Sequence, residues 1–406
     1  MIIGWVEGVA GNRFSGWISM KNEWTGSEMS LVVFESGRRS WVKPITVVRS
    51  NRPDLERIPN TYNIEFDFDS ERFYKGASTC SIQLRISHDL QEYPICVTPQ
   101  LMLQALNSNI GIKSGIAFGR VSSDGAAVIG AGGNIFLKGG SNNVEGMYLD
   151  EFNIDTEGWV ELLNRRKKTS NALDVSFIQM FIPEKSSVNY WNVPFKATKG
   201  SPAFNKLLQQ IKQDELLPAI TLSHLEYLPD EIHCESIFRS FDTHLSTYGA
   251  KLIVDKFFEK FFFKGLLYRT GEVCFGEAHG DIGSRFLDDG QVIEKPPLYS
   301  SLYDVSGNLL EPSLIYSYDS PKGNIGLQRA WKCSDAPIQK RVLCFGGSSF
   351  ERGQVSSTLS WWFSRLFKEF HFCWSPEYLP NLVNQVRPDL VVCQSIERFL
   401  NVLPSE

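Results

Sequence analysis

Short apolar runs separated by turn-forming residues fill roughly the first hundred residues of the chain. Clear examples are residues 30–34, 64–68 and 80–86, in which apolar side chains alternate with polar ones or form short clusters. A period of two is typical of half-buried strands. Roughly six or seven such runs predict a small all-β sandwich over residues 1–97.

From about residue 110 onward, helical periodicity alternates with buried apolar runs. Strands are predicted at 134–137, 174–182, 341–345 and 388–393. Helices are predicted at 155–168, 250–263 and 354–370, with Ser246 as an N-cap for the second of them. Residues 265–335 have weak periodicity, so we expect loops with short strands there. The alternation favours an α/β fold with a mainly parallel sheet and helices on both of its faces.

The change of pattern divides the chain into an all-β domain at 1–97, a linker at 98–111 and a larger α/β domain at 112–406. Within the linker, a segment rich in Leu and Met predicts a short connecting helix at 98–109. A chain of 406 residues exceeds one ordinary hydrophobic core, which agrees with this division.

Composition and charge narrow the possible classes of function. The chain is 42% hydrophobic and 21% charged, with a net charge of −5. Because no basic stripe is available to neutralise phosphates, we expect no nucleic-acid partner. The first residues lack the features of a secretory signal, and no apolar stretch reaches the roughly 18 residues of a membrane span. The sequence therefore predicts a cytoplasmic protein without a transmembrane segment.

Eight cysteines are scattered singly, with no C-x-x-C spacing. This distribution is typical of reduced, mostly buried thiols rather than of a disulfide framework or a zinc site. We expect no metal at the functional site and no tightly bound cofactor.

Aromatic side chains are frequent in the first domain; they are Trp5, Phe14, Trp17, Trp24 and Trp41. Core and edge packing accounts for some of them. The others could form a platform on which sugar rings stack. Both interpretations stay open on the sequence.

The segment Phe241-Asp242-Thr243-His244 has a carboxylate two residues before an imidazole. In an extended segment such residues project to the same side, so Asp242 can accept a hydrogen bond from one ring nitrogen of His244. This bond fixes the tautomer and leaves the other nitrogen available as a base. For these two residues taken alone, capping or packing of the turn by His244 is the simpler interpretation. His279 is an alternative base, but it has no carboxylate placed like Asp242.

The segment Gly346-Gly347-Ser348-Ser349-Phe350 follows the apolar run 341–345, so its serines are expected at the carboxyl end of a buried strand. Ligands gather at this edge of a parallel sheet. A helix expected to begin near residue 353 would add backbone N–H groups and its positive dipole end, which stabilise an oxyanion. The same glycines and serines are also typical of an ordinary turn.

Together these segments resemble circularly permuted SGNH/GDSL-type hydrolases of the alginate O-acetyltransferase branch. Residues 347–350 are similar to the family's Gly-Asp-Ser-Phe block, with Ser348 where the family usually has Asp. Residues 241–244, followed by Gly249-Ala250, are similar to its Asp-Thr-His-Trp block, with Leu245 in place of the aromatic residue. The histidine precedes the serine, as in this branch. Further similar blocks, in the same order, lie at 134–137 with 139–142, 183–186, 280–283, and 388–389 with 397–400.

The resemblance covers roughly residues 110–402 and implies an SGNH-like three-layer α/β/α domain with a catalytic triad. Ser349 would be the nucleophile, His244 the general base and Asp242 the carboxylate that orients it. The chain departs from the family pattern at Ser348 and Leu245, but the three triad residues are all present. The choice between the two serines and the nature of the pocket wall stay open.

The candidates for oxyanion or substrate contacts are Ser348, Asn142 and Arg352. Asn142 follows a predicted strand and could supply an amide donor, although a sharp turn explains its segment equally well. Arg352 could bind an anionic group or be a solvated loop residue. Glu397 and Arg398 are expected to form a structural ion pair near the last strand.

These features predict a polysaccharide O-acyltransferase, most simply an O-acetyltransferase, that works through an acyl-serine intermediate. The expected partners are a polysaccharide or oligosaccharide acceptor bound by a carbohydrate-binding first domain, an acyl donor such as acetyl-CoA, and other enzymes of polysaccharide biosynthesis. Two alternatives stay open: a carbohydrate acetylesterase with the same triad, and a catalytically inactive glycan-binding protein.

Overall fold

The computed structural model describes residues 2–406 except for 11–12, 21, 27, 36–37, 52–59, 68–80, 90, 98–110, 113–120, 131–133, 150–151, 191–192, 224–236, 263–267, 277, 287–292 and 295. The chain folds into two compact units. The first consists of Met1–Ser141, Asn192–Phe195 and Asp281–Val292, and the second of Asn142–Trp191, Lys196–Gly280 and Ile293–Glu406. The predicted linker at 98–111, with its helix at 98–109, lies almost entirely outside the described residues. The domain boundaries therefore stay predictions.

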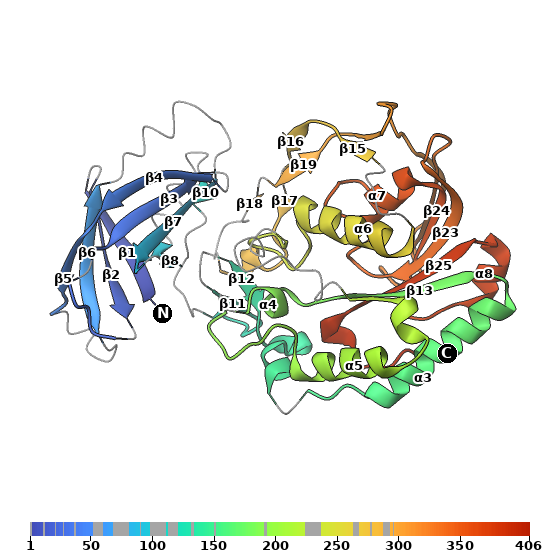
Figure 1. Cartoon of the computed structure of the whole chain (residues 1–406), viewed down its shortest axis with the longest axis horizontal. Coiled ribbons are helices and arrows are strands. Elements are labelled where there is room, and N and C mark those ends of the chain that lie inside the picture. The colour runs from blue at the N-terminus through green and yellow to red at the C-terminus, as the bar shows by residue number, and fades with distance from the viewer. Residues whose placement is uncertain are drawn as a thin grey trace. The chain divides into compact units, whose positions relative to one another are not determined.

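The first unit contains two five-stranded β-sheets (Figure 1). One has the order β5-β6-β2-β1-β9 and consists of β1 (Ile2–Ala10), β2 (Arg13–Met20), β5 (Thr46–Arg49), β6 (Thr61–Asp67) and β9 (Cys96–Val97). The other has the order β10-β7-β3-β4, with β8 paired to β7, and consists of β3 (Ser30–Glu35), β4 (Arg38–Pro44), β7 (Ser81–His88), β8 (Gln91–Pro94) and β10 (Gly111–Ile112).

Both sheets contribute side chains to one hydrophobic core. Ile18 and Ile64 of the first sheet and Val33 and Leu84 of the second are completely buried in it. Alternation along each strand directs these residues to the same side, as the period of two predicts. The two sheets therefore face each other across a shared core.

The aromatic residues of this unit are mostly used for packing where the structure describes them. Phe14 stacks on Phe66 in the core, and Trp17 is buried. Trp24 is half-buried and meets Tyr62 edge-on. The side chains of Trp5 and Trp41 lie outside the described residues. A sugar-binding platform in this unit stays a prediction.

The second unit is built around a seven-stranded sheet with the order β14-β13-β25-β23-β24-β22-β21. Its strands are β13 (Ser176–Ile182), β14 (Thr221–Ser223), β21 (Ser313–Tyr318), β22 (Gln328–Lys332), β23 (Ile338–Gly346), β24 (Phe367–Trp374) and β25 (Leu390–Ile396). The strands from β14 to β24 are parallel, whereas β22 and β21 add an antiparallel edge. The predicted α/β class with a mainly parallel sheet is confirmed.

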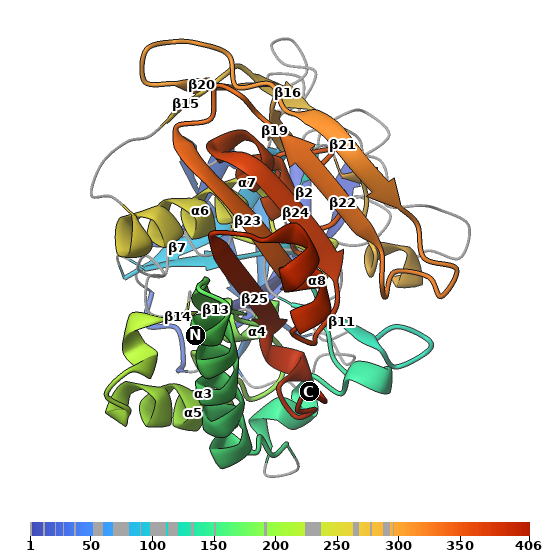
Figure 2. The same ribbon diagram turned by 90° about the vertical axis from the view of Figure 1, so that its right-hand side faces the viewer.

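Helices cover both faces of this sheet (Figure 2). They are α3 (Thr156–Ala172), α4 (Lys185–Val188), α5 (Pro202–Gln213), α6 (Thr247–Phe261), α7 (Leu359–Leu366) and α8 (Pro380–Val386). On one face, Val342 of β23 belongs to a core with Phe257 of α6 and Phe363 of α7. On the other face, Phe181 of β13 packs with α3 and α5, and Leu343 of β23 packs with α8. Adjacent strand residues point to opposite faces, so helices are needed on both sides.

The two units also contain several short elements. Two-stranded antiparallel sheets are formed by β11 (Ala127–Ile129) with β12 (Ile135–Leu137), β15 (Tyr268–Thr270) with β20 (Leu302–Asp304), β16 (Val273–Phe275) with β19 (Pro297–Tyr299), and β17 (Ala278–His279) with β18 (Ile293–Glu294). Single 3-10 turns are η3 (Gly140–Asn142), η4 (Glu145–Tyr148), η5 (Leu217–Ala219), η8 (Gly283–Phe286) and η9 (Glu397–Phe399). Of these elements, β11, β12 and η8 belong to the first unit. The strand predicted at 134–137 therefore belongs to a small hairpin and not to the main sheet.

The helix predicted at 354–370 is wrong at both ends. Residues 351–358 form turns, and α7 occupies only Leu359–Leu366. The segment that follows is β24, in which buried Phe370 and Phe372 alternate with Glu369 and His371. In this segment, burial of every second side chain in a strand is favoured over the helix that the sequence periodicity predicts.

The predictions about membrane helices and cysteines can be compared with the structure only for the described residues. Among these, no helix has both the length and the apolar character that crossing a membrane requires. Five cysteines have described side chains: four are buried, as expected, and Cys274 is exposed.

Candidate active site

The serine-bearing turn leaves the carboxyl end of β23, as the sequence predicts. The last residues of β23 are buried on both faces of the sheet, which fixes the point at which the turn begins. The backbone N–H of Gly347 donates to the side-chain oxygen of Gln394 on β25 at 2.9 Å. The turn closes with a hydrogen bond from the N–H of Phe350 to the carbonyl of Gly347, at 3.0 Å. Ser348 and Ser349 lie between these two contacts.

Phe350 attaches this turn to the hydrophobic core. Its side chain is completely buried, stacks on Phe372 with ring centroids 5.9 Å apart and meets Phe363 edge-on at 5.2 Å. Buried aromatic pairs contribute packing energy beyond the area that they remove from water. The residue that follows the two serines therefore acts as an apolar anchor for them.

The expected helix dipole is not placed behind the serines. The prediction that a helix begins near residue 353 is wrong, because α7 begins only at Leu359 and a run of turns intervenes. The N–H of Leu359 donates instead to the carbonyl of Ser349 at 2.8 Å. This bond holds the serine backbone but supplies no donor to a ligand.

Asp242 and His244 lie in a tight loop at residues 239–244. An antiparallel bridge between Phe238 and Leu245 closes the stem of the loop. The N–H of Arg239 donates to the carbonyl of His244 at 3.0 Å. Just beyond it, Ser246 caps α6 by accepting from the N–H of Gly249 at 3.0 Å, as predicted.

Two glycines lie against this loop. A Cβ atom at Gly280 would lie 2.1 Å from the carbonyl oxygen of Phe241, and one at Gly249 would lie 2.0 Å from that of Ile237. No side chain larger than hydrogen fits at such distances. Glycine at these positions allows the backbone to approach the loop closely.

Asp242 binds His244 as the spacing predicts. Its Oδ1 accepts from the backbone N–H of His244 at 2.8 Å and lies 2.5 Å from Nδ1 of the ring. Its Oδ2 pairs with Arg239 at 2.6 Å. Only 2% of the Asp242 side chain is exposed. Both carboxylate oxygens are thus engaged within the loop.

The charge state of Asp242 follows from these contacts. Burial acts to raise its pKa, but the hydrogen bond from the His244 ring and the charges of His244 and Arg239 outweigh burial and hold the pKa well below its ordinary value. Asp242 is therefore ionised at physiological pH and can only accept hydrogen bonds. Nδ1 of His244 must carry the hydrogen in this contact, which leaves Nε2 to face the pocket.

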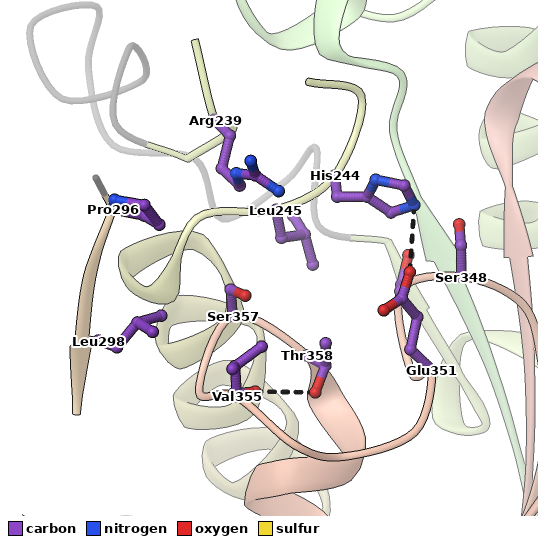
Figure 3. Close-up of a pocket in the computed structure, with 11 residues that line it drawn as sticks. Arg239, His244, Leu245, Pro296, Leu298, Ser348, Glu351, Val355, Ser357 and Thr358 are labelled. Atoms are coloured by element: carbon purple, nitrogen blue, oxygen red, sulfur yellow. Dashed lines mark hydrogen bonds and ion pairs between the residues drawn. The ribbon is translucent and has the colours of Figure 1, made fainter. Parts of the chain in front are cut away.

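His244 and both serines line one pocket of about 110 Å³ (Figure 3). The lining residues are Arg239, His244, Leu245, Pro296, Leu298, Ser348, Ser349, Glu351, Val355, Ser357 and Thr358. In the close-up, His244, Ser348 and Glu351 lie on one side and Pro296 and Leu298 on the other. Ser349 is buried, with 7% exposed, whereas Ser348 is half-buried. The structure therefore brings together a base with a fixed tautomer and two alcohols.

Glu351 is a pocket residue that the sequence analysis missed. Its Oε1 lies 3.5 Å from Nε2 of His244, so the imidazole has a carboxylate near each nitrogen. Burial raises the pKa of the Glu351 carboxyl above its ordinary value, and the charge of His244 acts against this rise. Its backbone has a positive φ of 47°, a conformation that costs free energy in a residue with a side chain. A charged residue two positions after the serine was the available sequence signal.

Arg239 is the second missed residue. It has 12% of its side chain exposed and pairs with the buried oxygen of Asp242 on the side away from the histidine. Nothing in the local sequence distinguishes it from a solvated arginine. Its role depends on the fold of the loop.

The other predicted residues have different positions. Asn142 ends η3 and Arg352 is exposed, with Nη2 3.5 Å from Oδ1 of Asn324; neither lines this pocket. Their proposed substrate contacts, and the expected absence of a metal, stay predictions. The side chain of His279 lies outside the described residues.

The ion pair expected between Glu397 and Arg398 is wrong. Glu397 is completely buried and accepts from the backbone N–H groups of Glu184 at 2.8 Å and Ser201 at 2.7 Å. Arg398 pairs with Glu184 at 2.5 Å. Since residues 397–399 form a 3-10 turn, the two neighbouring side chains diverge to different partners.

Comparison with known proteins gives remote structural similarities. No protein-family model matches the chain, and no curated protein does. Bacillus cereus PatB1 is similar over 61% of this chain and 91% of its own, with 11% identity and a TM-score of 0.42. PatB1 with a sulfonyl adduct is similar over 68% and 96%, with 10% identity and a TM-score of 0.44. The O-acetyltransferase domain of Pseudomonas putida AlgJ is similar over 69% and 94%, with 15% identity and a TM-score of 0.42. At these scores the similarities assign neither the fold family nor the activity.

Proposed function

We propose that this chain is a polysaccharide O-acyltransferase, most simply an O-acetyltransferase, with Ser349, His244 and Asp242 as its catalytic residues. One observation carries the proposal: an imidazole whose Nδ1 is bound by an ionised carboxylate lies in the same pocket as two serines. Ser349 is the proposed nucleophile because it occupies the serine position of the resembled Gly-Asp-Ser-Phe block. Ser348, which lines the pocket, is a proposed oxyanion donor. Asn142 as a second donor and Arg352 as a contact for an anionic group stay part of the proposal, although neither lines the pocket in this structure.

In the first half-reaction, Nε2 of His244 removes the hydroxyl proton of Ser349 while Oγ attacks the carbonyl carbon of the acyl donor. The bond from that carbon to the leaving group breaks, and the leaving group takes the proton from His244. The product is acyl-Ser349. The ionised Asp242 stabilises the imidazolium that forms in between.

In the second half-reaction, a sugar hydroxyl gives its proton to Nε2 of His244 and attacks the acyl carbon. The bond between that carbon and Oγ of Ser349 breaks, and Oγ recovers the proton. The acyl group leaves on the sugar as an ester. Water in place of the sugar would give acetylesterase activity, the first alternative.

The remaining assignments belong to the same proposal. Residues 112–406 would form an SGNH-like three-layer α/β/α catalytic domain, and residues 1–97 an accessory domain that binds the polysaccharide. The acyl donor would be a thioester such as acetyl-CoA, used in the cytoplasm alongside other enzymes of polysaccharide biosynthesis.

Purified protein incubated with a chromogenic acetyl ester, with and without oligosaccharide acceptors, tests the proposal. A transferase acetylates the oligosaccharide, which mass spectrometry detects as an added acetyl group. Release of free acetate at the same rate with and without acceptors would instead assign an esterase. No turnover, together with glycan binding that Ser349→Ala leaves intact, would assign the inactive binding protein.

A further inference from the structure

A buried lysine contacts the loop that carries Asp242 and His244. Lys185 is the first residue of α4, and only 1% of it is exposed. Removing an ammonium group from water is costly unless hydrogen bonds replace its hydration. The partners of Lys185 therefore indicate what the burial of its charge stabilises.

Three backbone carbonyl oxygens accept hydrogen bonds from Nζ of Lys185. They belong to Arg239, Ser240 and Asp242, at 2.6, 2.8 and 3.2 Å. All three lie in the loop 239–244. An ammonium group has three N–H donors, so carbonyls that converge on it are fixed relative to the lysine and to one another.

Lys185 connects this loop to the central sheet. It comes three residues after the end of β13, which pairs in parallel with β25. β25 in turn pairs with β23, the strand that leads into the serine turn. Strands packed in a sheet resist local opening far more than loops do. Two strand pairings and one lysine thus link the base-bearing loop to the strand that positions Ser349.

We infer that Lys185 is a positioning residue for the acid–base pair. By binding three carbonyls of the loop, it holds Asp242 in place, and Asp242 in turn directs Nε2 of His244 toward the serines. Lys185 does not touch the reacting atoms and acts through Asp242 and His244. The role in catalysis rests on the proposed function, whereas the role in holding the loop does not.

The test compares Lys185→Gln and Lys185→Met with the full-length wild-type protein. Glutamine keeps two N–H donors on a neutral side chain, so it is the variant to use if the methionine variant does not fold. Lys256→Met is the matched control, because half-buried Lys256 pairs with exposed Glu259 within α6. Thermal unfolding identifies the variants that are folded.

Hydrogen exchange gives the first readout, which does not depend on activity. The N–H groups of Arg239, His244 and Ser246 are hydrogen-bonded within or next to the loop. We expect them to exchange about tenfold faster in the Lys185 variants and unchanged in the control, the effect of losing charge-assisted hydrogen bonds. Unchanged exchange in the Lys185 variants would overturn the inference, whether or not the protein is an enzyme.

The rate of serine modification by phenylmethanesulfonyl fluoride, followed by intact mass, gives the second readout. We expect modification to be about tenfold slower in the Lys185 variants than in the wild type. In the Asp242→Asn background, the lysine change should leave the modification rate nearly the same, because the effects of residues that act as one unit are not additive. A full additional loss in the Asp242→Asn background would overturn the inference. A wild-type protein not modified at Ser349 would count against the proposed function, while the exchange measurement still decides the role of Lys185.

Discussion

The two segments that form the pocket are held in place by different physical means. The loop 239–244 is fixed by charge: Asp242 binds Arg239 and His244, and Lys185 binds the backbone. The turn 347–351 is fixed mainly by packing, through the buried ring of Phe350. The free energy that a charged contact contributes depends strongly on protonation and on geometry. The free energy that apolar burial contributes depends much less on either. Changes in the first segment should therefore alter chemistry and pH dependence, and changes in the second should alter stability.

The largest expected effect is on the serine itself. Ser349→Ala should lower kcat/KM for acyl transfer by roughly 10⁴ to 10⁶, because no covalent intermediate can form. Ser348→Ala, the comparison variant in the same turn, should cost roughly 10²–10³-fold, the effect of losing one oxyanion donor. A retained rate in Ser349→Ala with a loss in Ser348→Ala would show that the other serine is the nucleophile.

Asp242→Asn tests the charged segment. It should lower kcat/KM by roughly 10³ or more, because asparagine no longer fixes the tautomer of His244 or stabilises the imidazolium. The difference in the free energy of unfolding between wild type and Asp242→Asn should depend on pH. The folded-state pKa of Asp242 is lowered from 3.8, so the stability that its charge adds is complete above that value and is lost as the pH falls below it.

Urea unfolding of wild type and Asp242→Asn as a function of pH measures this dependence. The difference in the free energy of unfolding should be present at pH 5 and should narrow below about pH 4. A difference that does not change with pH would mean that the carboxylate charge does not stabilise the loop.

Phe350→Ala tests the apolar segment. Deleting a completely buried phenylalanine typically costs about 3–5 kcal/mol of unfolding free energy. We expect a loss of this size, nearly the same at pH 4 and pH 7, because no titrating group takes part. A strongly pH-dependent loss would contradict the distinction between the two segments.

Gly280→Ala displaces the charged loop without altering its charges. The new Cβ would lie 2.1 Å from the carbonyl oxygen of Phe241, so the backbone that carries Asp242 has to move. A shift of about 1 Å near reacting groups can cost roughly 10²-fold in rate. We expect a loss of that order in kcat, measured with the chromogenic ester. A wild-type kcat would show that the position of this loop does not limit the reaction.

The smallest expected effect concerns Glu351. The folded-state pKa of this carboxyl is raised from 4.5, so its contribution to stability is complete below that value and is lost as the pH rises through the folded-state pKa. Glu351→Gln should therefore be more stable than wild type at pH 8, by less than about 1 kcal/mol after solvent screening, and equal to it at pH 4. Lower stability at pH 8 would mean that the contact with His244 outweighs burial.

Local sequence predicted much of this architecture. Buried apolar runs identified β13, β23 and β25, and Ser246 marked the start of α6, because these signals depend on neighbouring residues. The contact of Asp242 with His244 also follows from spacing alone. Local signals failed for β21, whose six residues are all exposed and so show no alternation of burial. They also failed for β24, where strand pairing replaced part of a predicted helix.

The residues that support the site could not be predicted from the sequence for a related reason. Lys185 is more than fifty positions before the carbonyls that it binds, and Glu351 approaches His244 from a segment more than a hundred positions away. Lys185 lies in the similar block 183–186 and Glu351 comes two positions after the serine, but neither position indicates contact with this loop. Only the folded sheet brings the two side chains to the loop, so spacing along the chain does not identify their partners.

The most direct test of the central claim is to trap the acyl-enzyme. The protein is mixed with the chromogenic acetyl ester in the absence of any acceptor, quenched within a turnover and examined by intact mass and peptide mapping. We predict one acetyl group on Ser349 in the wild type and none in Ser349→Ala or, at the same time point, in Asp242→Asn. Ester turnover without an acetyl group on Ser349, or with one on a residue outside this pocket, would contradict the proposed role of the three residues.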